Sequence, residues 1–498
     1  AGANALNTAV GYFAGLNVST GVQNTLVGGL AGDALTEGGE NTALGYLALS
    51  GETKGDRNVA LGAYALFTQN NTTNADTYNT AIGYNAGFAT TTGTKNTIIG
   101  GLAGDALTTG EKNIAIGYNA LTNEDAHGFN VAIGPDALRD QNAGADAYNT
   151  AIGYAAGVNV STGVQNTLVG GSAGDSLTTG TNNVAIGFEA LATEDAHSFN
   201  VAIGHRALKT QNAGASAYNT AVGYNAGLAV TTGIENTLVG GEAGHEITIG
   251  NYNTALGLFS LHSNKDGDHN TAIGYKALED YDDGDGNGHN TAVGSKSQFN
   301  ATTGEFNTSL GSLSMGVGVT TGDGNVALGY KAGEAITSGA DNVGVGVNAL
   351  NDITTGTRNV AIGSYTLDAE DANGKNVAIG YAALTTLNAG ADGFNTAVGH
   401  EAGVAMTSGV NNTIVGGLAG DSLTTGEGSV AIGKSALSAT TVGHDNVAIG
   451  KETLASNVLG SSSIAIGSLA LQDQAPTGTG NTYNIAIGHH AGKEVTTG

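Results

Sequence analysis

The stretch of this sequence best suited to binding a ligand is the acidic segment EDYDDGDGNGHN, residues 279–290. Asp283, Asp285 and Asn287 are spaced like the first ligands of an EF-hand calcium loop, in which carboxylate and amide oxygens bind the cation. The twelfth position of such a loop requires a bidentate Glu, whereas this sequence has Gly294 there. The segment therefore predicts either a looser calcium site or a solvated acidic turn, and calcium is the one cofactor left open.

A second motif, EDAH, occurs at residues 124–127 and again at 194–197. A carboxylate close to a histidine can ligate a metal or exchange a proton. The third occurrence, at residues 370–373, reads EDAN and lacks the histidine, and no nucleophile accompanies any of the three. We therefore expect a surface turn here rather than a catalytic site, and we predict that the protein is not an enzyme.

Both motifs lie inside a repeat that fills the whole chain. Its consensus reads N-[TVI]-x-[IVL]-G-x-x-A-[GL], and 28 repeats follow one another, most of them 17 residues apart. If the Asn is position 0, position 4 is Gly and position 3 is Ile, Val or Leu in every repeat. A fixed short period is the signature of a repeat architecture. We expect residues 1–498 to form one continuous repeat region.

Four successive repeats make a larger group that returns after about 70 residues. One such group is NTAIGYNAG, NTIIGGLAG, NIAIGYNAL and NVAIGPDAL, and the grouping is irregular near residues 279–325 and 446–484. The opening AGANALNTAV matches the middle of a connection, and the final EVTTG ends shortly before another repeat would begin. We expect the sequence to be an excerpt of a longer chain.

Each repeat predicts one coil of a parallel β-solenoid. A unit of this length cannot bury an apolar face alone, and its recurring Gly disfavours a helix. The segment TAIG is alternating and β-branched, as in a short strand, and Gly at position 4 then turns the chain because it accepts a positive φ. A second strand is expected through the Ala at position 7, with a return turn at TTG or STG. The predicted fold class is all-β, with about 28 coils of 17 residues.

Within a coil, we expect the side chains at positions 1 and 3 to point inward and the Ala at position 2 to point outward. Equivalent residues would then stack at the strand spacing of about 4.8 Å. This predicts a ladder of Asn side-chain amides, each hydrogen bond contributing about 0.5–1.5 kcal/mol, and a parallel column of glycines. The ladder includes Asn79, Asn96, Asn113 and Asn130, and the column includes Gly83, Gly100, Gly117 and Gly134.

The composition fits a thin core and excludes several classes of partner. The chain has 83 Gly, 2 Pro, no Trp or Cys and 5% aromatic residues, so few side chains are large enough for a thick core. The formal net charge of -27 argues against a nucleic-acid partner, since phosphate binding depends on Lys and Arg. No apolar run is long enough to insert in a membrane. A thin core favours association of several solenoids side by side.

The repeats NVAIGYAAL, NVAIGFEAL and SIAIGSLAL resemble the head repeats of YadA-type trimeric autotransporter adhesins. The longer pattern NTAIGYNAG…TTG…NT is similar to repeats of phage tail fibres and large bacterial surface proteins. The resemblance covers essentially the whole chain, although the coils here are longer and grouped in fours. It implies a homotrimeric rod located outside the cell, on a virion fibre or a bacterial surface.

We therefore predict an extracellular structural or adhesive fibre segment, with a cell-surface glycan or protein receptor as its partner besides itself. The wider connections between groups, QNAGADAY and QNAGASAY, are candidates for recognition loops, because bumps on a solenoid often carry binding sites. The alternative is that they are passive spacers. The candidate surface residues in these connections are Gln141, Asn142, Asp146, Gln211 and Asn212.

Two other functions are compatible with a solenoid. An ice-binding face needs a threonine row in every coil; pairs such as Thr108-Thr109 occur, but the third and fourth coils of most groups lack them. A polysaccharide-degrading β-solenoid enzyme needs acidic, basic or aromatic groups that converge at one irregular place. Only residues 279–290 are irregular in this way, and they lack a set of Lys or Arg partners.

Overall fold

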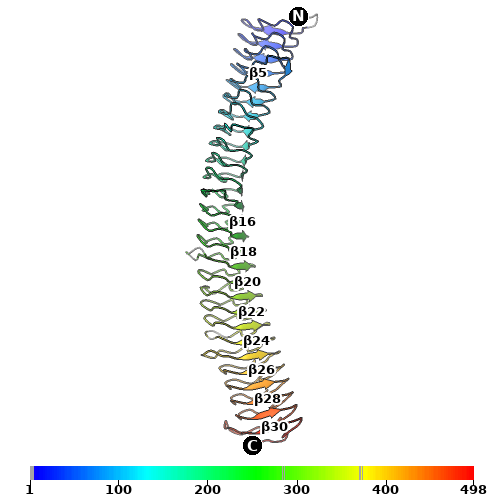
Figure 1. The fold of residues 1–498 in the computed structure, drawn as a ribbon, viewed down its shortest axis with the longest axis vertical. Helices are drawn as coiled ribbons and strands as arrows, with labels where there is room; N and C mark the ends of the chain where they lie inside the picture. The colour runs from blue at the N-terminus through cyan, green and yellow to red at the C-terminus, as the bar shows by residue number, and fades with distance from the viewer. Residues whose placement is uncertain (1–4, 283, 285–286, 370–371, 373, 498) are drawn as a thin grey trace. The chain divides into compact units, whose positions relative to one another are not determined.

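The computed structural model describes residues 5–282, 284, 287–369, 372 and 374–497. Along these residues the protein is all-β, and one turn of a parallel β-solenoid recurs about every 17 residues, as the repeat predicts. The chain divides into two compact units, residues 1–251 and 252–498. In each unit, short strands follow one another along the chain (Figure 1).

The strands of the first unit are β1 (Thr8–Val10), β2 (Thr25–Val27), β3 (Thr42–Leu44), β4 (Gly55–Asp56), β5 (Val59–Leu61), β6 (Ala75–Asp76), β7 (Thr80–Ile82), β8 (Thr97–Ile99), β9 (Ile114–Ile116), β10 (Val131–Ile133), β11 (Thr150–Ile152), β12 (Thr167–Val169), β13 (Val184–Ile186), β14 (Val201–Ile203), β15 (Thr220–Val222) and β16 (Thr237–Val239). Those of the second unit are β17 (Thr254–Leu256), β18 (Thr271–Ile273), β19 (Thr291–Val293), β20 (Thr308–Leu310), β21 (Val326–Leu328), β22 (Val343–Val345), β23 (Val360–Ile362), β24 (Val377–Ile379), β25 (Thr396–Val398), β26 (Thr413–Val415), β27 (Val430–Ile432), β28 (Val447–Ile449), β29 (Ile464–Ile466) and β30 (Ile485–Ile487).

Equivalent strands pair in parallel with no shift in register. In the first unit, Thr80 of β7 is opposite Thr97 of β8, and Thr97 is opposite Ile114 of β9. The second unit repeats this arrangement, for example between β17 and β18 and between β29 and β30. The short strands β4 and β6 form a separate parallel pair in the connections that precede β5 and β7. Within each unit, successive repeats therefore lie directly over one another.

The glycines at position 4 form the predicted column. Gly83 and Gly100 have φ values of 141° and 139°, in a region that side chains rarely adopt. A Cβ atom on Gly83 would lie 2.4 Å from the carbonyl oxygen of Gly100, and one on Gly100 would lie 2.3 Å from that of Gly117. The backbones of successive coils are thus too close for any side chain at this position.

The predicted orientation of the strand side chains is wrong. Ala81, at position 2, is fully buried, whereas Thr80 and Ile82 on either side of it are only half-buried. The interior of the coil is too narrow for a large residue on every strand, because Ala86 at position 7 is also buried there. Small residues therefore point inward and the β-branched residues outward.

A larger inward residue occurs where the opposite side of the coil is glycine. Ile98 takes position 2 in the second repeat of its group, and it is buried. The same repeat has Gly104 at position 8, and the preceding repeat has Gly87, where a Cβ would lie 2.9 Å from Ile98 Cδ1. The third and fourth repeats have Ala at position 2 and place Leu121 and Leu138 at position 8 instead. The four-repeat grouping is therefore a pattern of complementary side-chain volumes.

The expected second strand through position 7 is not found in the described residues. On either side of buried Ala120, Asn119 and Leu121 have left-handed φ values of 55° and 53°. The N–H of Asn119 donates to the carbonyl of Gly101 in the preceding coil, and the N–H of Leu121 donates to that of Ala137 in the next. Each left-handed non-glycine residue costs about 1–2 kcal/mol, which the hydrogen bonds to both neighbouring coils offset.

The Asn at position 0 forms a buried ladder that runs through the backbone as well as the side chains. Asn79 Oδ1 accepts the N–H of Asn96 at 2.9 Å, and Asn96 Oδ1 accepts the N–H of Asn113 at 2.9 Å. The next step, to Asn130, is 3.0 Å. Many side-chain Nδ2 groups also donate across their own coil, for example from Asn96 to the carbonyl of Gly110 at 2.9 Å, whereas that of Asn130 is buried without a partner among the described residues. Most steps therefore join an amide to a backbone group rather than one amide to another.

Replacing a column glycine is expected to disrupt the solenoid locally. Gly100→Ala should lower the free energy of unfolding by about 3 kcal/mol, because its Cβ meets the Gly117 backbone and its φ is unfavourable. Gly101→Ala is the matched control, since the nearest atom to its Cβ is 3.8 Å away. Urea denaturation followed by circular dichroism measures both; equal stability of the two variants would contradict the close backbone contact.

Removing the Asn96 side chain should leave two buried backbone groups, the N–H of Asn113 and the carbonyl of Gly110, without their side-chain hydrogen bonds. We expect Asn96→Ala to cost about 3 kcal/mol, since each unpaired buried group costs about 1–3 kcal/mol. Asn96→Ser should lose less, because Ser429 takes this position naturally and its Oγ accepts the N–H of Asn446 at 3.3 Å. Denaturation of the three proteins measures the order; a serine variant no more stable than the alanine variant would argue against the ladder.

Candidate functional site

The predicted calcium segment lies only partly within the described residues. Asp283 and Asp285 fall outside them. Asn287 is exposed, and its backbone carbonyl accepts the Tyr281 hydroxyl at 3.3 Å. The calcium site therefore stays a prediction.

The wider connections place their predicted surface residues in two environments. Asn142, Asp146 and Asn212 are exposed, whereas Gln141 and Gln211 are buried, which differs from their assignment to the surface. Gln141 Oε1 accepts the amide of Asn149 at 2.7 Å, and Gln211 Oε1 accepts that of Asn219 at 2.6 Å. Each glutamine thus joins the ladder to the wider connection.

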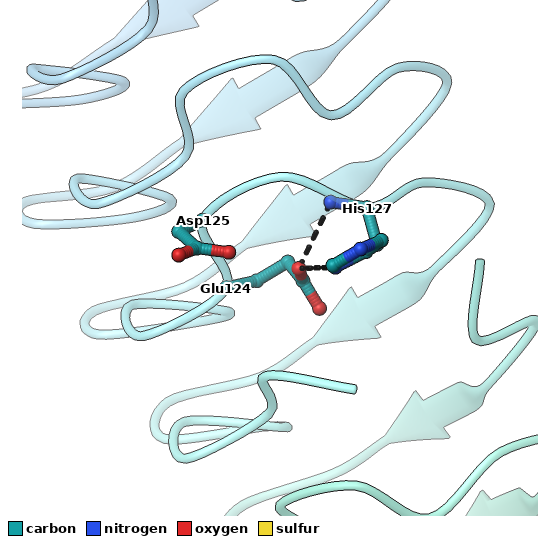
Figure 2. Close-up of side chains that lie close together, drawn as sticks. All are labelled: Glu124, Asp125 and His127. Carbon is teal, nitrogen blue, oxygen red and sulfur yellow. Dashed lines mark hydrogen bonds and ion pairs between the residues drawn. The ribbon is translucent and has the colours of Figure 1, made fainter. Parts of the chain in front are cut away.

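The EDAH motif at residues 124–127 brings three metal-ligating side chains together (Figure 2). One ligand atom from each of Glu124, Asp125 and His127 lies within 4.8 Å of the others. Glu124 is fully buried, Asp125 is exposed and His127 is partly buried. The expectation of a surface turn is therefore wrong for the glutamate.

The solenoid explains why these residues converge. Glu124 is at position 11, an inward position that buried Leu107 occupies in the preceding coil. His127 is at position 14, which is Gly110 in the preceding coil, where a Cβ would lie 2.4 Å from the carbonyl of His127. The next repeat, from Asn130 to Asn149, is two residues longer than usual, and its wider connection lies beside this turn, where Asp146 Oδ1 accepts the N–H of Gly128 at 3.0 Å. The inward position 11 and the histidine three residues later thus bring the imidazole beside the buried carboxyl, with Nδ1 3.3 Å from Glu124 Oε1.

Glu124 has an incomplete set of hydrogen bonds. Its Oε1 accepts the backbone N–H of His127 at 3.0 Å and lies 3.3 Å from His127 Nδ1. Its Oε2 is buried and has no hydrogen-bond partner among the described residues. Burial raises the pKa of Glu124, and the contacts with His127 oppose this shift.

The second EDAH motif keeps the Glu–His pair but changes the aspartate. Glu194 Oε1 lies 2.7 Å from His197 Nδ1, its Oε2 is again buried without a partner in the described part of the chain, and burial raises its pKa. Asp195, however, accepts the Thr178 hydroxyl at 2.6 Å through its Oδ1. The carboxylate of Asp195 is therefore held by the preceding coil.

Glu52 occupies the same position 11 and shows how a buried glutamate can be satisfied in this fold. Its Oε1 accepts the backbone N–H groups of Thr53 at 2.9 Å and Gly55 at 2.7 Å. Its Oε2 accepts the side-chain amides of Gln69 at 2.9 Å and Asn71 at 3.0 Å. Both oxygens of Glu52 are saturated, in contrast to those of Glu124 and Glu194.

A different feature, a regular uncharged surface of threonine and aliphatic side chains, follows the outward side of the strands. In the repeat that begins at Asn149, Ile152 is 38% exposed, and the flanking Tyr148 and Tyr154 are 53% and 64% exposed. Positions 1 and 3 carry only Thr, Val, Ile or Leu in all 28 repeats. We call this surface the strand face. Sequence reasoning missed it because it assigned the β-branched residues to the core.

Rings at the edge of the strand face stack from coil to coil. Phe129 and Tyr148 have centroids 4.9 Å apart and an interplanar angle of 18°. In the second unit, four successive rings continue this arrangement, with centroid distances of 4.7, 4.7 and 5.3 Å. These rings are Tyr252, His269, His289 and Phe306. The stacks fix exposed aromatic side chains at the coil spacing.

Comparisons with known proteins add no relative to this chain. No protein-family model matches it, and no curated protein has a matching sequence. Among the described residues, no helix has the length and apolarity needed to cross a membrane. The resemblance to trimeric adhesin and tail-fibre repeats therefore stays a prediction.

Half-buried aspartates at position 9 give the fold a pH dependence. Burial raises the pKa of Asp105, Asp175 and Asp421. Asp368 has the largest shift: burial, reinforced by the Asp352 carboxylate, raises its pKa to about 6. Its Oδ1 is buried and has no hydrogen-bond partner among the residues that the structure describes. The protonated form of Asp368 is therefore favoured by folding.

The contribution of Asp368 to stability should be fully present below pH 4 and be lost as the pH rises through about 6. We expect Asp368→Asn to raise the free energy of unfolding at pH 7 by about 1 kcal/mol and to flatten its dependence between pH 4 and 7. Asp352→Asn should raise the free energy of unfolding by less, because it removes the repulsion between the two carboxylates but leaves Asp368 buried. Urea denaturation at several pH values measures the free energy of unfolding of each variant. If that free energy depends on pH between 4 and 7 as strongly in Asp368→Asn as in the parent chain, the prediction is contradicted.

Proposed function

We propose that this chain is a structural, non-enzymatic segment of an extracellular fibre that assembles with other copies of itself through the strand face. The observation that supports the proposal is the half-exposed strand face, aliphatic at position 3 and threonine, valine or isoleucine at position 1, with exposed aromatic rings along its edge. Soluble monomers rarely leave contiguous apolar surfaces larger than a few hundred Å² open to solvent. An apolar surface that continues from coil to coil favours a partner with the same period.

Another copy of the chain is the partner that best fits this surface. The protein has a formal net charge of -27, yet positions 1 and 3 carry no charged residue in any repeat. The repulsive charge is thus kept off the surface that two copies would share. The period of the strand face is the same in every copy, so contacts made at one coil can recur at the next.

The trimeric state and the adhesive role rest on the resemblance to YadA-type and tail-fibre repeats. In an adhesive fibre, the exposed residues of the wider connections, Asn142, Asp146 and Asn212, would be presented once in each four-repeat group. Repeated weak contacts with a glycan or protein receptor can raise the overall affinity by orders of magnitude through multivalency. The solenoid would then act as a spacer and as a scaffold.

Sedimentation equilibrium tests the assembly. We expect the chain to form a homotrimer, and we expect a variant carrying Ile133→Lys, Ile152→Lys and Val169→Lys to weaken association at least tenfold. Those three residues are at position 3 of successive coils. The control carries Thr109→Lys, Thr162→Lys and Thr179→Lys, which add the same charge at exposed return turns. A monomeric parent chain would contradict the proposal, and so would equal weakening by both variants.

A further inference from the structure

We propose that Glu124, Asp125 and His127 form a binding site for a divalent transition-metal cation such as Zn²⁺. Figure 2 shows the Glu124 side chain between those of Asp125 and His127, and one ligand atom from each lies within 4.8 Å of the others. This inference is independent of the proposed fibre function, because it depends only on groups within one chain.

The chemistry of the three ligands selects the class of cation. Imidazole nitrogen together with carboxylate oxygen suits Zn²⁺ and related transition metals, whereas calcium and magnesium prefer oxygen ligands alone. Zn²⁺ binds these atoms at about 2.0–2.2 Å, so two ligands of one ion lie at most about 4.4 Å apart. The cluster is close to that limit. Asp125 is exposed, and rotation of its side chain can bring its carboxylate within range.

The orphaned oxygen of Glu124 is the second observation that points to a ligand. Its Oε2 is fully buried and has no hydrogen-bond partner among the described residues. Glu52, at the same position of its own coil, has both oxygens saturated by backbone and amide donors. The fold can therefore satisfy a glutamate here without a cation. In the coil after Glu124, Gln141 takes the place of Gln69 but donates its amide to the Ser161 carbonyl at 3.2 Å, and Ala143 takes the place of Asn71.

The remaining features of the cluster also fit a cation. Two carboxylates and a neutral imidazole would neutralise the charge of a divalent ion. Asp125 is exposed and His127 is only partly buried, so water can reach the open coordination positions from the solvent side. Three protein ligands with water in the remaining position is the usual arrangement of an open zinc site.

The second EDAH motif supplies a comparison within the same chain. Glu194 and His197 form a closer pair, at 2.7 Å, and the Asp195 carboxylate is held by the Thr178 hydroxyl. A cation at the second motif would have to displace that hydrogen bond. We therefore expect the first motif to bind the metal more tightly.

Isothermal titration of the full chain with Zn²⁺ tests the site. We expect one tight site per chain, and we expect Asp125→Asn and His127→Asn each to weaken it at least tenfold. His127→Asn reproduces the natural EDAN sequence of residues 370–373. Asp195→Asn and His197→Asn are the matched controls and should leave the tight site unchanged. Circular dichroism of each variant checks that the solenoid is intact, and Co²⁺ absorption reports imidazole and carboxylate ligation directly.

Three results would overturn the proposal. The first is that the parent chain binds Zn²⁺ no more tightly than a variant in which both His127 and His197 are replaced by Asn. The second is that Asp125→Asn binds Zn²⁺ as tightly as the parent chain, since the exposed aspartate can be replaced without disturbing the core. The third is two equal sites that His127→Asn and His197→Asn abolish equally, because the aspartate would then have no role.

Discussion

The close approach of backbone to backbone at position 4 is the constraint on which the rest of each unit depends. A Cβ on Gly83 would lie 2.4 Å from the Gly100 carbonyl oxygen, and the same contact recurs from coil to coil. Only glycine permits it, so glycine occupies this position in every repeat. With this point of each coil fixed over the next, the strands pair without a shift in register and the Asn side chains reach the next backbone N–H.

A narrow coil then determines where large and polar side chains go. Position 2 is mostly alanine; a bulky residue there, such as Ile98, lies beside glycine, and repeats with alanine there can bury a leucine at position 8 instead. The β-branched residues are placed outside, where they leave an apolar face on each unit. In a coil of regular length, Glu124 at position 11 and His127 at position 14 replace the leucine and glycine of the preceding coil. The candidate metal ligands therefore arise from substitutions within a coil of regular length, and the candidate recognition loops arise where a connection widens.

The period, the strand and the role of glycine were predictable because each depends on local spacing. The orientation of the strand was not, because the alternation in TAIG defines two faces without saying which is inside. The sequence did contain a signal for the inward side: Ile98 at position 2 is accompanied by Gly104 at position 8 of the same repeat, so the two side-chain volumes are complementary. Position 11 was a similar missed signal: it is apolar in many repeats, which marks it as inward, and Glu124 occupies it. The left-handed residues around Ala120 could not be predicted, since Asn and Leu there are fixed by hydrogen bonds from neighbouring coils.

Distances between spin labels test directly whether each repeat is one coil stacked on the last. The chain has no cysteine, so cysteines introduced at the exposed return turns can be labelled without background. Thr92 and Thr162 are four repeats apart, and Thr92 and Thr179 are five. At about 4.8 Å per coil, electron–electron double resonance should give backbone separations of about 19 Å and about 24 Å, one strand spacing apart. Separations that do not increase by a strand spacing with each added repeat would contradict the stacked solenoid.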